Sequence, residues 1–270
     1  MDNSKEHVIR DNFGWLRESV NDHRQIEGAV INKAVKLVLC DKPSLTPMES
    51  HEIFKSLSGE FYSLPLFARF CAELTRSLKI IDENAQNLSP RLTVYIRNQL
   101  ADKAFDVFSR QFHGLRAIYS HDFKSACEDV YYDRADSCIL PLESSADGLL
   151  MPFRSMLMKY ELKIAAVTKV STGEGSVQSI ALVTGGTVDS FGNVLEAYLP
   201  SVTQNDLLSL CIAVSEIGCN IVRITSVKSP MKDLYDHHIS FTSDSNSLSV
   251  LKYFLNGKYP AHVILGQYKN

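Results

Sequence analysis

This sequence of 270 residues lacks long apolar runs, a strong charge of one sign and a signal-peptide core. No apolar run approaches the roughly 20 residues that a membrane-spanning helix needs, so we expect no membrane span. The formal net charge of -3 gives no overall basic character, which disfavours nucleic acid as a partner. Residues 2–6 are polar, unlike the start of a secretory signal, and we therefore expect a cytoplasmic protein.

Metal and disulfide patterns are scarce as well. The six cysteines are scattered without a CxxC pair, and several lie in apolar runs, which is typical of buried free thiols. His237 and His238 alternate across a predicted strand, so both cannot face one metal ion. The glycine-rich segment 171–176 lacks the spacing of a phosphate-binding or dinucleotide-binding loop. The sequence predicts neither a metal nor a cofactor.

Residues 1–88 have the periodicity of helices. A first helix is predicted over Phe13–Leu39 and ends before Pro43, since proline cannot continue a helix. Thr46 and Pro47 have the pattern of an N-cap followed by a first helical residue. A third helix is predicted from an amphipathic stripe at three- and four-residue spacing, which comprises Phe67, Phe70, Cys71, Leu74, Leu78 and Ile81.

From Arg91 onward, strands alternate with helices of about ten residues, which predicts a mainly parallel sheet with helices packed on it. The predicted strands are Leu92–Ile96, Leu115–Tyr119, Ser137–Leu142, Leu162–Val167 and Ile180–Val183, and the helices are Leu100–Phe108, Phe123–Val130 and Leu149–Tyr160. The last part of the chain has the order βαββαβ, which predicts a ferredoxin-like sandwich. Its elements are Val194–Leu199, Gln204–Ile217, Cys219–Val227, His237–Phe241, Ser247–Leu255 and Ala261–Gly266.

Residues 138–148 are the most informative segment of the chain. The apolar run Cys138–Leu142 is followed by Glu143, Ser144 and Ser145, and Gly148 opens a helix-like stretch. A buried strand that delivers hydroxyls and backbone N–H groups to a helix N-terminus is a natural site for a carboxylate ligand. The same residues could instead only cap the following helix, and the sequence leaves both interpretations open.

The segment Leu140–Gly148 resembles the Leu-Pro-Ile-Glu-Asn-Ser-x-x-Gly signature of prephenate dehydratases. Members of that family have two lobes with the substrate between them, and the second lobe is an insertion in the first. Here Val167 is joined to the strand Ile180–Val183 by a short polar turn. The resemblance therefore implies a single lobe over residues 91–186, with the second lobe missing.

Several positions that the resemblance assigns to substrate depart from the family pattern. The turn after the first strand, residues 97–100, has no glycine. The family's Thr-Arg-Phe triplet is matched by Gln178-Ser179-Ile180, which offers neither a comparable proton donor nor a bidentate cation. We therefore expect a pseudoenzyme without dehydratase activity. The ligand positions that the resemblance implies here are Glu143, Ser144, Ser145 and Gln178.

Residues 193–270 resemble the ACT domain that follows dehydratase domains. The strand Cys219–Ser226 is similar to the family's Asn-Leu-x-x-Ile-Glu-Ser, and Val263–Tyr268 is similar to its closing Val-Leu-Gly-x-Tyr. The resemblance implies an amino-acid effector site and pairing into homodimers through the ACT-like and helical parts. The implied effector positions are Asn205, Asp206, Leu207, Leu208 and Ser226, of which only Leu207 and Ser226 keep the family's residue.

The helical residues 1–88 occupy the place of chorismate mutase in bifunctional members of the family, and their three-helix outline resembles it. The implied catalytic positions are Arg17, Lys33, Lys36 and Glu52. A mutase needs cations around a dicarboxylate, yet the glutamine expected late in the last helix is matched by Asp82. Basic residues on such a helix are also typical of a solvated surface.

The predicted fold is thus multidomain α and α/β: a chorismate-mutase-like helical domain, a single lobe of prephenate-dehydratase type and a ferredoxin-like ACT domain. We expect a protein of phenylalanine metabolism that binds a small carboxylic acid or an aromatic amino acid. One alternative is an active mutase or a related enzyme on a chorismate-like acid. Another is a sensor whose helical part binds a protein or nucleic-acid partner.

Overall fold

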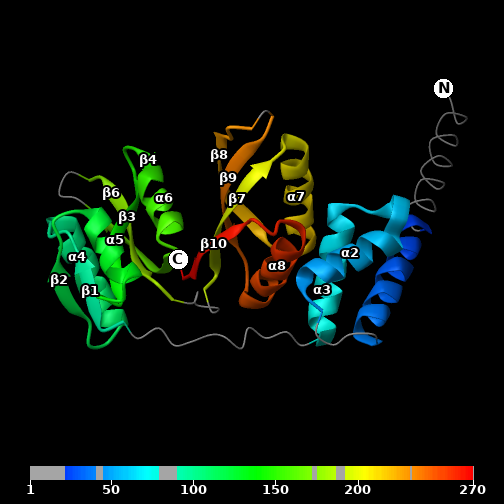
Figure 1. Ribbon diagram of the computed structural model, residues 1–270, viewed down its shortest axis with the longest axis horizontal. Coiled ribbons are helices and arrows are strands. Elements are labelled where there is room, and N and C mark those ends of the chain that lie inside the picture. The colour runs from blue at the N-terminus through cyan, green and yellow to red at the C-terminus, as the bar shows by residue number, and fades with distance from the viewer. Residues whose placement is uncertain are drawn as a thin grey trace, which may run out of the picture. The chain divides into compact units, whose positions relative to one another are not determined.

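The computed structural model describes residues 22–40, 45–78, 90–171, 175–186, 192–231 and 233–269. They belong to two compact units (Figure 1). The first unit takes the chain up to Lys79 together with Leu208–Ile217 and Val250–Pro260. The second takes Ile80–Leu207, Gly218–Ser249 and Ala261–Asn270. None of the described helices has the length and apolar character needed to span a membrane.

The first unit contains the three helices that the periodicity predicts. The first is described over residues 22–40, and it is followed by α2 (Pro47–Ser58), a 3-10 turn (Gly59–Phe61) and α3 (Leu64–Leu78). The Thr46 side chain accepts a hydrogen bond from Glu49 N, and the Glu49 carboxylate accepts one from Thr46 N at 2.9 Å. This capping box satisfies backbone donors at the start of α2 and confirms the predicted N-cap.

The amphipathic stripe of α3 forms the core of this unit. Phe67 and Phe70 are fully buried and pack against Phe54 of α2, with ring centroids 5.7 and 4.6 Å from that of Phe54. The ring of Phe254, from helix α8 (Ser245–Lys258), lies 5.4 Å from Phe67. The helical residues therefore form a compact body together with part of the C-terminal region, which the sequence did not indicate.

The second unit is built on one ten-stranded sheet with the strand order β2-β1-β3-β6-β5-β10-β7-β9-β8. The strands of its first half are β1 (Leu92–Tyr95), β2 (Arg116–Tyr119), β3 (Ser137–Ser144), β5 (Lys163–Ser171) and β6 (Val177–Thr184); the short β4 (Gly148–Leu149) pairs with β3 alone. Those of its second half are β7 (Val194–Val202), β8 (Asn220–Lys228), β9 (Tyr235–Thr242) and β10 (Val263–Tyr268).

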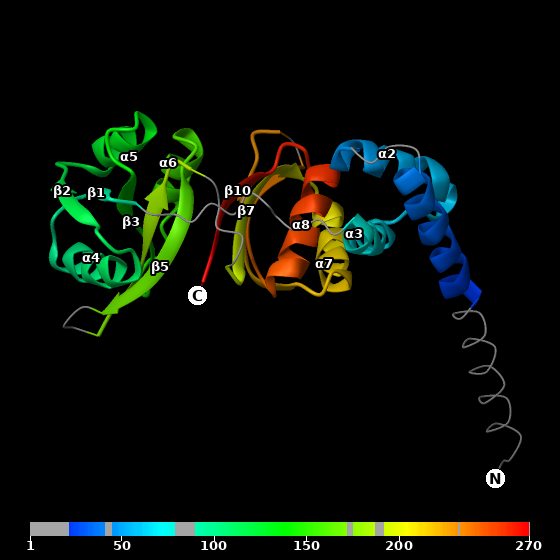
Figure 2. The ribbon, with the colours of Figure 1, turned by 90° about the horizontal axis from the view of Figure 1, so that it is seen from below.

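Helices cover both faces of the first half of the sheet (Figure 2). Helix α4 (Gln99–Gln111) packs on one face, while α5 (Phe123–Tyr131) and α6 (Met151–Lys159) pack on the other. Strand β3 alternates between the two cores, since Cys138 and Leu140 join the α5–α6 side and Ile139 joins the α4 side. Burial on both faces explains why β3 is a continuous apolar run in the sequence.

The expected mainly parallel sheet is in fact mixed. Strand β1 pairs parallel with β2 and β3, but β6 pairs antiparallel with both β3 and β5. Strand β6 follows β5 directly, and the ladder continues to the pair Ser171–Val177, so the short connection fixes an antiparallel hairpin. Strands β3 and β5 still run in the same direction, as expected for a crossover through α6, with β6 inserted between them.

From β7 to β10 the chain has the predicted βαββαβ order, with α7 (Gln204–Glu216) following β7 and α8 following β9. The four strands lie in the order β10-β7-β9-β8 and pair antiparallel throughout, as those of a ferredoxin-like sheet do.

The two halves join through β10 and β5, which pair parallel at Gly266 and Ile164. A Cβ atom at Gly266 would lie 2.5 Å from Ile164 O, so only glycine allows this approach. Lys163 strengthens the junction, since its Nζ donates to Ile264 O at 2.6 Å.

Candidate functional site

The carboxyl ends of β1 and β3 are the first place to look for a ligand site. Helices α4 and α5 cover opposite faces of the sheet, so the carboxyl ends of β1 and β3 lie at a topological switch point. Helix N-termini at such a point normally offer free N–H groups to a ligand. Here the Asn98 side chain accepts from Leu100 N and Ala101 N at 3.0 and 2.9 Å, so the start of α4 is already occupied by its own cap.

Helix α5 is capped in the same way. The Asp122 carboxylate accepts from Ser125 N at 2.7 Å, and this bond lowers the pKa of Asp122. A carboxylate at a helix N-terminus also complements the helix dipole. Both helix starts at this edge of the sheet therefore carry an internal acceptor, and an external anion would have to compete with it.

The segment Glu143–Ser145 does not lead into a helix as expected. Glu143 and Ser144 continue β3, and the chain turns back into β4, which pairs with them before α6 begins at Met151. The expectation was wrong because Gly148 takes a positive φ of 70°, which is not helical, and begins β4 instead of a helix. The hydroxyl of Ser144 accepts from Ala146 N at 3.2 Å within this turn.

The structure brings the four implied ligand positions together. Ser144 lies opposite Gln178 in the β3–β6 ladder, next to the pair formed by Glu143 and Ser179. The Ser145 hydroxyl accepts from Val177 N at 3.0 Å, and Ser145 N donates to Val177 O at 2.8 Å. These segments are thus neighbours in space, but the two serine hydroxyls already accept hydrogen bonds from backbone N–H groups, those of Ala146 and Val177.

Glu143 forms a bidentate ion pair with Arg223 of β8. Two bonds of 2.8 Å join the Arg223 Nη1 and Nη2 atoms to the Glu143 carboxylate oxygens. The hydrogen bonds from Arg223 lower the pKa of Glu143, and those to Glu143 raise the pKa of Arg223. The side chains remain 32% and 38% exposed, so solvent reaches this pair.

A second ion pair lies deep in the same unit. Arg154 and Glu196 are 2% and 6% exposed, and Arg154 Nη2 lies 3.2 Å from Glu196 Oε2. Arg154 Nη1 donates to Leu142 O at 2.7 Å, while Tyr268 donates its hydroxyl to Glu196 Oε1 at 2.6 Å. Burial raises the pKa of Tyr268 further above its usual range, and the charge of Glu196 adds to this effect.

His238 lies on β9 in the field of this buried pair. Burial and the neighbouring charge of Arg154 lower its pKa to about 4, so the ring is neutral near pH 7. Its ring centroid lies 4.9 Å from that of Tyr198 with the two rings tilted, and its Nδ1 has no hydrogen-bond partner among the described residues. Sequence reasoning missed Arg154, Glu196 and Arg223, although a lone charge inside an apolar strand such as Val194–Val202 is a usable signal of a buried pair.

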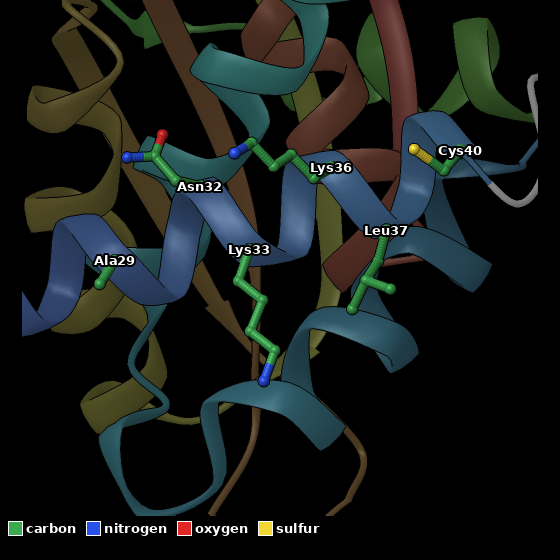
Figure 3. A pocket seen from close by; sticks show the side chains of 6 residues that line it. All are labelled: Ala29, Asn32, Lys33, Lys36, Leu37 and Cys40. Atoms are coloured by element: carbon green, nitrogen blue, oxygen red, sulfur yellow. The ribbon is translucent and has the colours of Figure 1, made fainter.

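The implied mutase residues are spread along the helical unit, and Arg17 and Asp82 lie outside the described residues. Lys33 and Lys36 line a hollow of about 430 Å³ along the helix over residues 22–40, together with Ala29, Asn32, Leu37 and Cys40. In Figure 3 the side chains of Lys33 and Lys36 point to opposite sides of this helix. Glu52 is on α2, 73% exposed, with a carboxylate oxygen 3.8 Å from His51 Nδ1.

The implied effector residues lie on α7 and β8. Asn205, Asp206, Leu207 and Leu208 occupy the first turns of α7, where Asp206 N donates to Thr203 Oγ1 at 3.1 Å. Leu208 is 65% exposed. Ser226 on β8 is hydrogen-bonded through Oγ to His237 Nδ1 at 2.8 Å.

The described cysteines are free thiols, with Cys71, Cys127, Cys138 and Cys219 buried. In the described part of the chain, no three His, Cys, Asp or Glu side chains cluster in a way that could hold a metal ion.

Solved structures of other proteins have a fold similar to that of this chain. No protein-family model matches this chain, and no curated protein matches it either. A solved structure of prephenate dehydratase from Streptococcus mutans superposes with a TM-score of 0.54 at 13% identity, covering 66% of this chain and 97% of the other. The chain shares its mixed α/β fold with that enzyme.

Two further solved structures have a similar likeness. Prephenate dehydratase from Arthrobacter aurescens in complex with L-Phe gives a TM-score of 0.51 at 14% identity, covering 66% of this chain and 90% of that one. GqqA, described as a novel type of quorum quenching acylase, gives 0.51 at 17% identity, with coverages of 66% and 94%. The same fold therefore accompanies two different activities, and it does not by itself assign a reaction.

Proposed function

We propose that this chain is a divergent relative of prephenate dehydratases that does not dehydrate prephenate and instead binds a small carboxylic acid or an aromatic amino acid. The proposal divides the chain into a chorismate-mutase-like part (1–88), a single dehydratase-like lobe (91–186) and an ACT-like part (193–270). It assigns the protein a regulatory role in phenylalanine metabolism, as a homodimer that pairs through its ACT-like and helical parts.

The observation that supports this proposal is that polar groups at the carboxyl edge of the sheet are already hydrogen-bonded to other groups of the chain. Asn98 occupies the N–H groups at the start of α4, and Glu143 is held by Arg223. A dehydratase needs a positioned acid for the departing hydroxyl and donors for the carboxylate. Gln178, the residue matched to the family's threonine, lies opposite Ser144 in the ladder and has no comparable proton to give.

The direct test combines turnover and binding on the full chain. We expect no conversion of prephenate to phenylpyruvate, and a saturable heat of binding with at least one of L-Phe, L-Tyr, prephenate, phenylpyruvate and chorismate. Turnover of prephenate above the uncatalysed rate would contradict the absence of activity. No heat of binding with any compound of the panel would contradict the binding role.

A variant of the α4 cap sharpens this test. Glycine is tolerated at an N-cap at a cost of only a few tenths of a kcal/mol, so Asn98→Gly should leave α4 folded while freeing Leu100 N and Ala101 N. If the acid binds at the carboxyl ends of β1 and β3, N98G should bind it more tightly than the wild type. The matched control is Asp122→Asn, which keeps a capping side chain on α5.

The hollow beside Lys33 and Lys36 supports a second candidate, residual chorismate mutase activity. Two ammonium groups at a hollow of this size favour a dicarboxylate, although they point to opposite sides of their helix. Chorismate consumption by the purified chain, lost in Lys33→Ala and Lys36→Ala but not in Lys55→Ala on α2, would support this candidate. No consumption by the wild type would remove it.

A further inference from the structure

Arg223 lies on the face of the ferredoxin-like sheet that carries polar groups. It faces Ser240 across the β8–β9 ladder, and Glu196 and Tyr268 are close enough to act on it electrostatically. An arginine placed on a rigid strand presents its planar fork in a fixed direction, which is the geometry that binds a carboxylate through two parallel bonds.

Glu143 occupies that fork as a ligand carboxylate would. Both of its oxygens accept bonds of 2.8 Å from the two terminal nitrogens of Arg223. The ladder between β3 and β6 shifts register between Pro141 and Glu143, and such an irregularity redirects a side chain. Glu143 is thus turned toward a residue that lies 80 positions further along the chain.

An external carboxylate can replace Glu143 on Arg223 without leaving either of these charged side chains buried and unpaired. Both side chains are about one third exposed, and an exposed turn, Ser145–Asp147, lies close behind Glu143 in the chain, so its carboxylate would be hydrated on release. Lys169 and Arg154 act on Glu143 as further positive charges, so an acid that replaced it would meet the same favourable field. The buried Arg154–Glu196 pair, at 3% and 8% side-chain exposure, has no such route to solvent.

We infer that Arg223 is the residue that binds the carboxylate of an external acid, and that Glu143 occupies it as an internal ligand when the acid is absent. The inference rests on the proposed function, because it assigns a receptor residue to the small acid proposed there. Acid binding then releases the β3–β4 hairpin from β8, which couples ligand occupancy to the position of that hairpin.

Competition between Glu143 and the external acid for Arg223 sets the expected change in the apparent dissociation constant of the acid. An exposed ion pair leaves Arg223 free for a fraction of the time, and the apparent dissociation constant of a competing acid rises by the inverse of that fraction. The measured strength of such pairs corresponds to a change of roughly two- to fivefold. Glu143→Gln keeps the size and an acceptor but removes the charge, so it should tighten acid binding by about that factor.

Titration calorimetry with phenylpyruvate and malonate on four variants tests this. We expect E143Q to bind about two- to fivefold more tightly than the wild type and Arg223→Gln to lose at least about tenfold. Arg223→Lys should fall between the wild type and R223Q, because it keeps the charge but not the fork. Asp129→Asn is the matched control, since Asp129 pairs with Arg134 at 2.7 Å in the same unit and should leave affinity unchanged.

The outcomes separate the inference from the proposed function. Binding to the wild type that neither E143Q nor R223Q alters would overturn the inference and leave the binding role standing. Absence of phenylpyruvate and malonate binding to both the wild type and E143Q, with native far-ultraviolet circular dichroism, would overturn the inference. The proposed binding role would fall with it if L-Phe, L-Tyr, prephenate and chorismate also gave no heat of binding. If R223Q alone loses the native spectrum, R223K and E143Q still test the inference. R223K must then bind the acid more weakly than the wild type, and E143Q must bind it more tightly.

Discussion

Replacement of Gly266 by alanine tests whether the two halves of the long sheet are joined as described. The alanine Cβ would lie 2.5 Å from Ile164 O and 2.6 Å from Ile164 Cβ. Ordinary contacts between non-bonded carbon atoms are about 3.5–4.0 Å, so β10 and β5 would have to separate by roughly 1 Å. Ile164 is fully buried and the opposing atoms belong to its backbone and Cβ, which cannot move aside as the end of a long side chain can.

The expected cost follows from the overpacking. Extra atoms in a packed core destabilise a protein by about 1–3 kcal/mol. Alanine also reduces the freedom of the unfolded chain by about 0.4–1 kcal/mol relative to glycine, which offsets part of that cost. We therefore expect Gly266→Ala to lower the free energy of unfolding by about 1–2 kcal/mol.

The assay is urea unfolding followed by far-ultraviolet circular dichroism, with Gly185→Ala as the control. A Cβ at Gly185 would meet only Val130 atoms at 3.6 Å, an ordinary contact, so G185A should stay within about 0.5 kcal/mol of the wild type. Hydrogen exchange should also quicken in residues 263–268 of G266A. A G266A midpoint equal to that of G185A would refute the close approach of β10 to β5.

Three further expectations follow from other contacts. Glu196→Gln leaves the guanidinium of Arg154 buried without its counter-charge and should cost about 3–5 kcal/mol in urea unfolding; a loss under about 1 kcal/mol would mean that the pair is solvated. The pKa of His238 is about 4 when folded and 6.5 when unfolded, so the unfolded chain binds more protons and stability falls as the pH drops from about 6.5 toward 4. Between pH 7 and pH 5 this residue should account for about 2 kcal/mol, seen as a shallower pH dependence in His238→Gln; parallel curves would count against the shift. Thr46→Ala removes the capping box of α2 and should cost about 1 kcal/mol by thermal unfolding, which no change in midpoint would contradict.

Most elements were predictable because their signals are local. The stripe of α3, the N-cap of α2 and the two-sided burial of β3 each leave a pattern within fifteen residues or fewer. The strand direction of β6 was not predicted, although its short connection to β5 favours a hairpin. The regular alternation of strands and helices before it favours a parallel strand instead.

The site was harder to predict because its contacts are distant in sequence. The β3–β6 ladder sets Glu143 opposite Ser179 and Ser144 opposite Gln178, while their role in ligand binding stays a prediction. Their chemistry depends on Arg223, which no local pattern connects with Glu143. The capping role of Asn98 was readable in principle, because asparagine before a helix is a preferred N-cap.

In the closing segment, the residues that match the dehydratase pattern have a physical explanation in folding. Gly266 is required by the approach of Ile164, and the Tyr268 hydroxyl donates to the buried Glu196. Folding alone accounts for both residues, so their presence carries no information about activity. At the carboxyl edge, Asn98 caps α4 and Gln178 lies opposite Ser144 in the β3–β6 ladder, so these two departures from the pattern have structural roles as well. Because this fold accompanies more than one activity, turnover and binding measured on the full chain decide between an enzyme and a binding role.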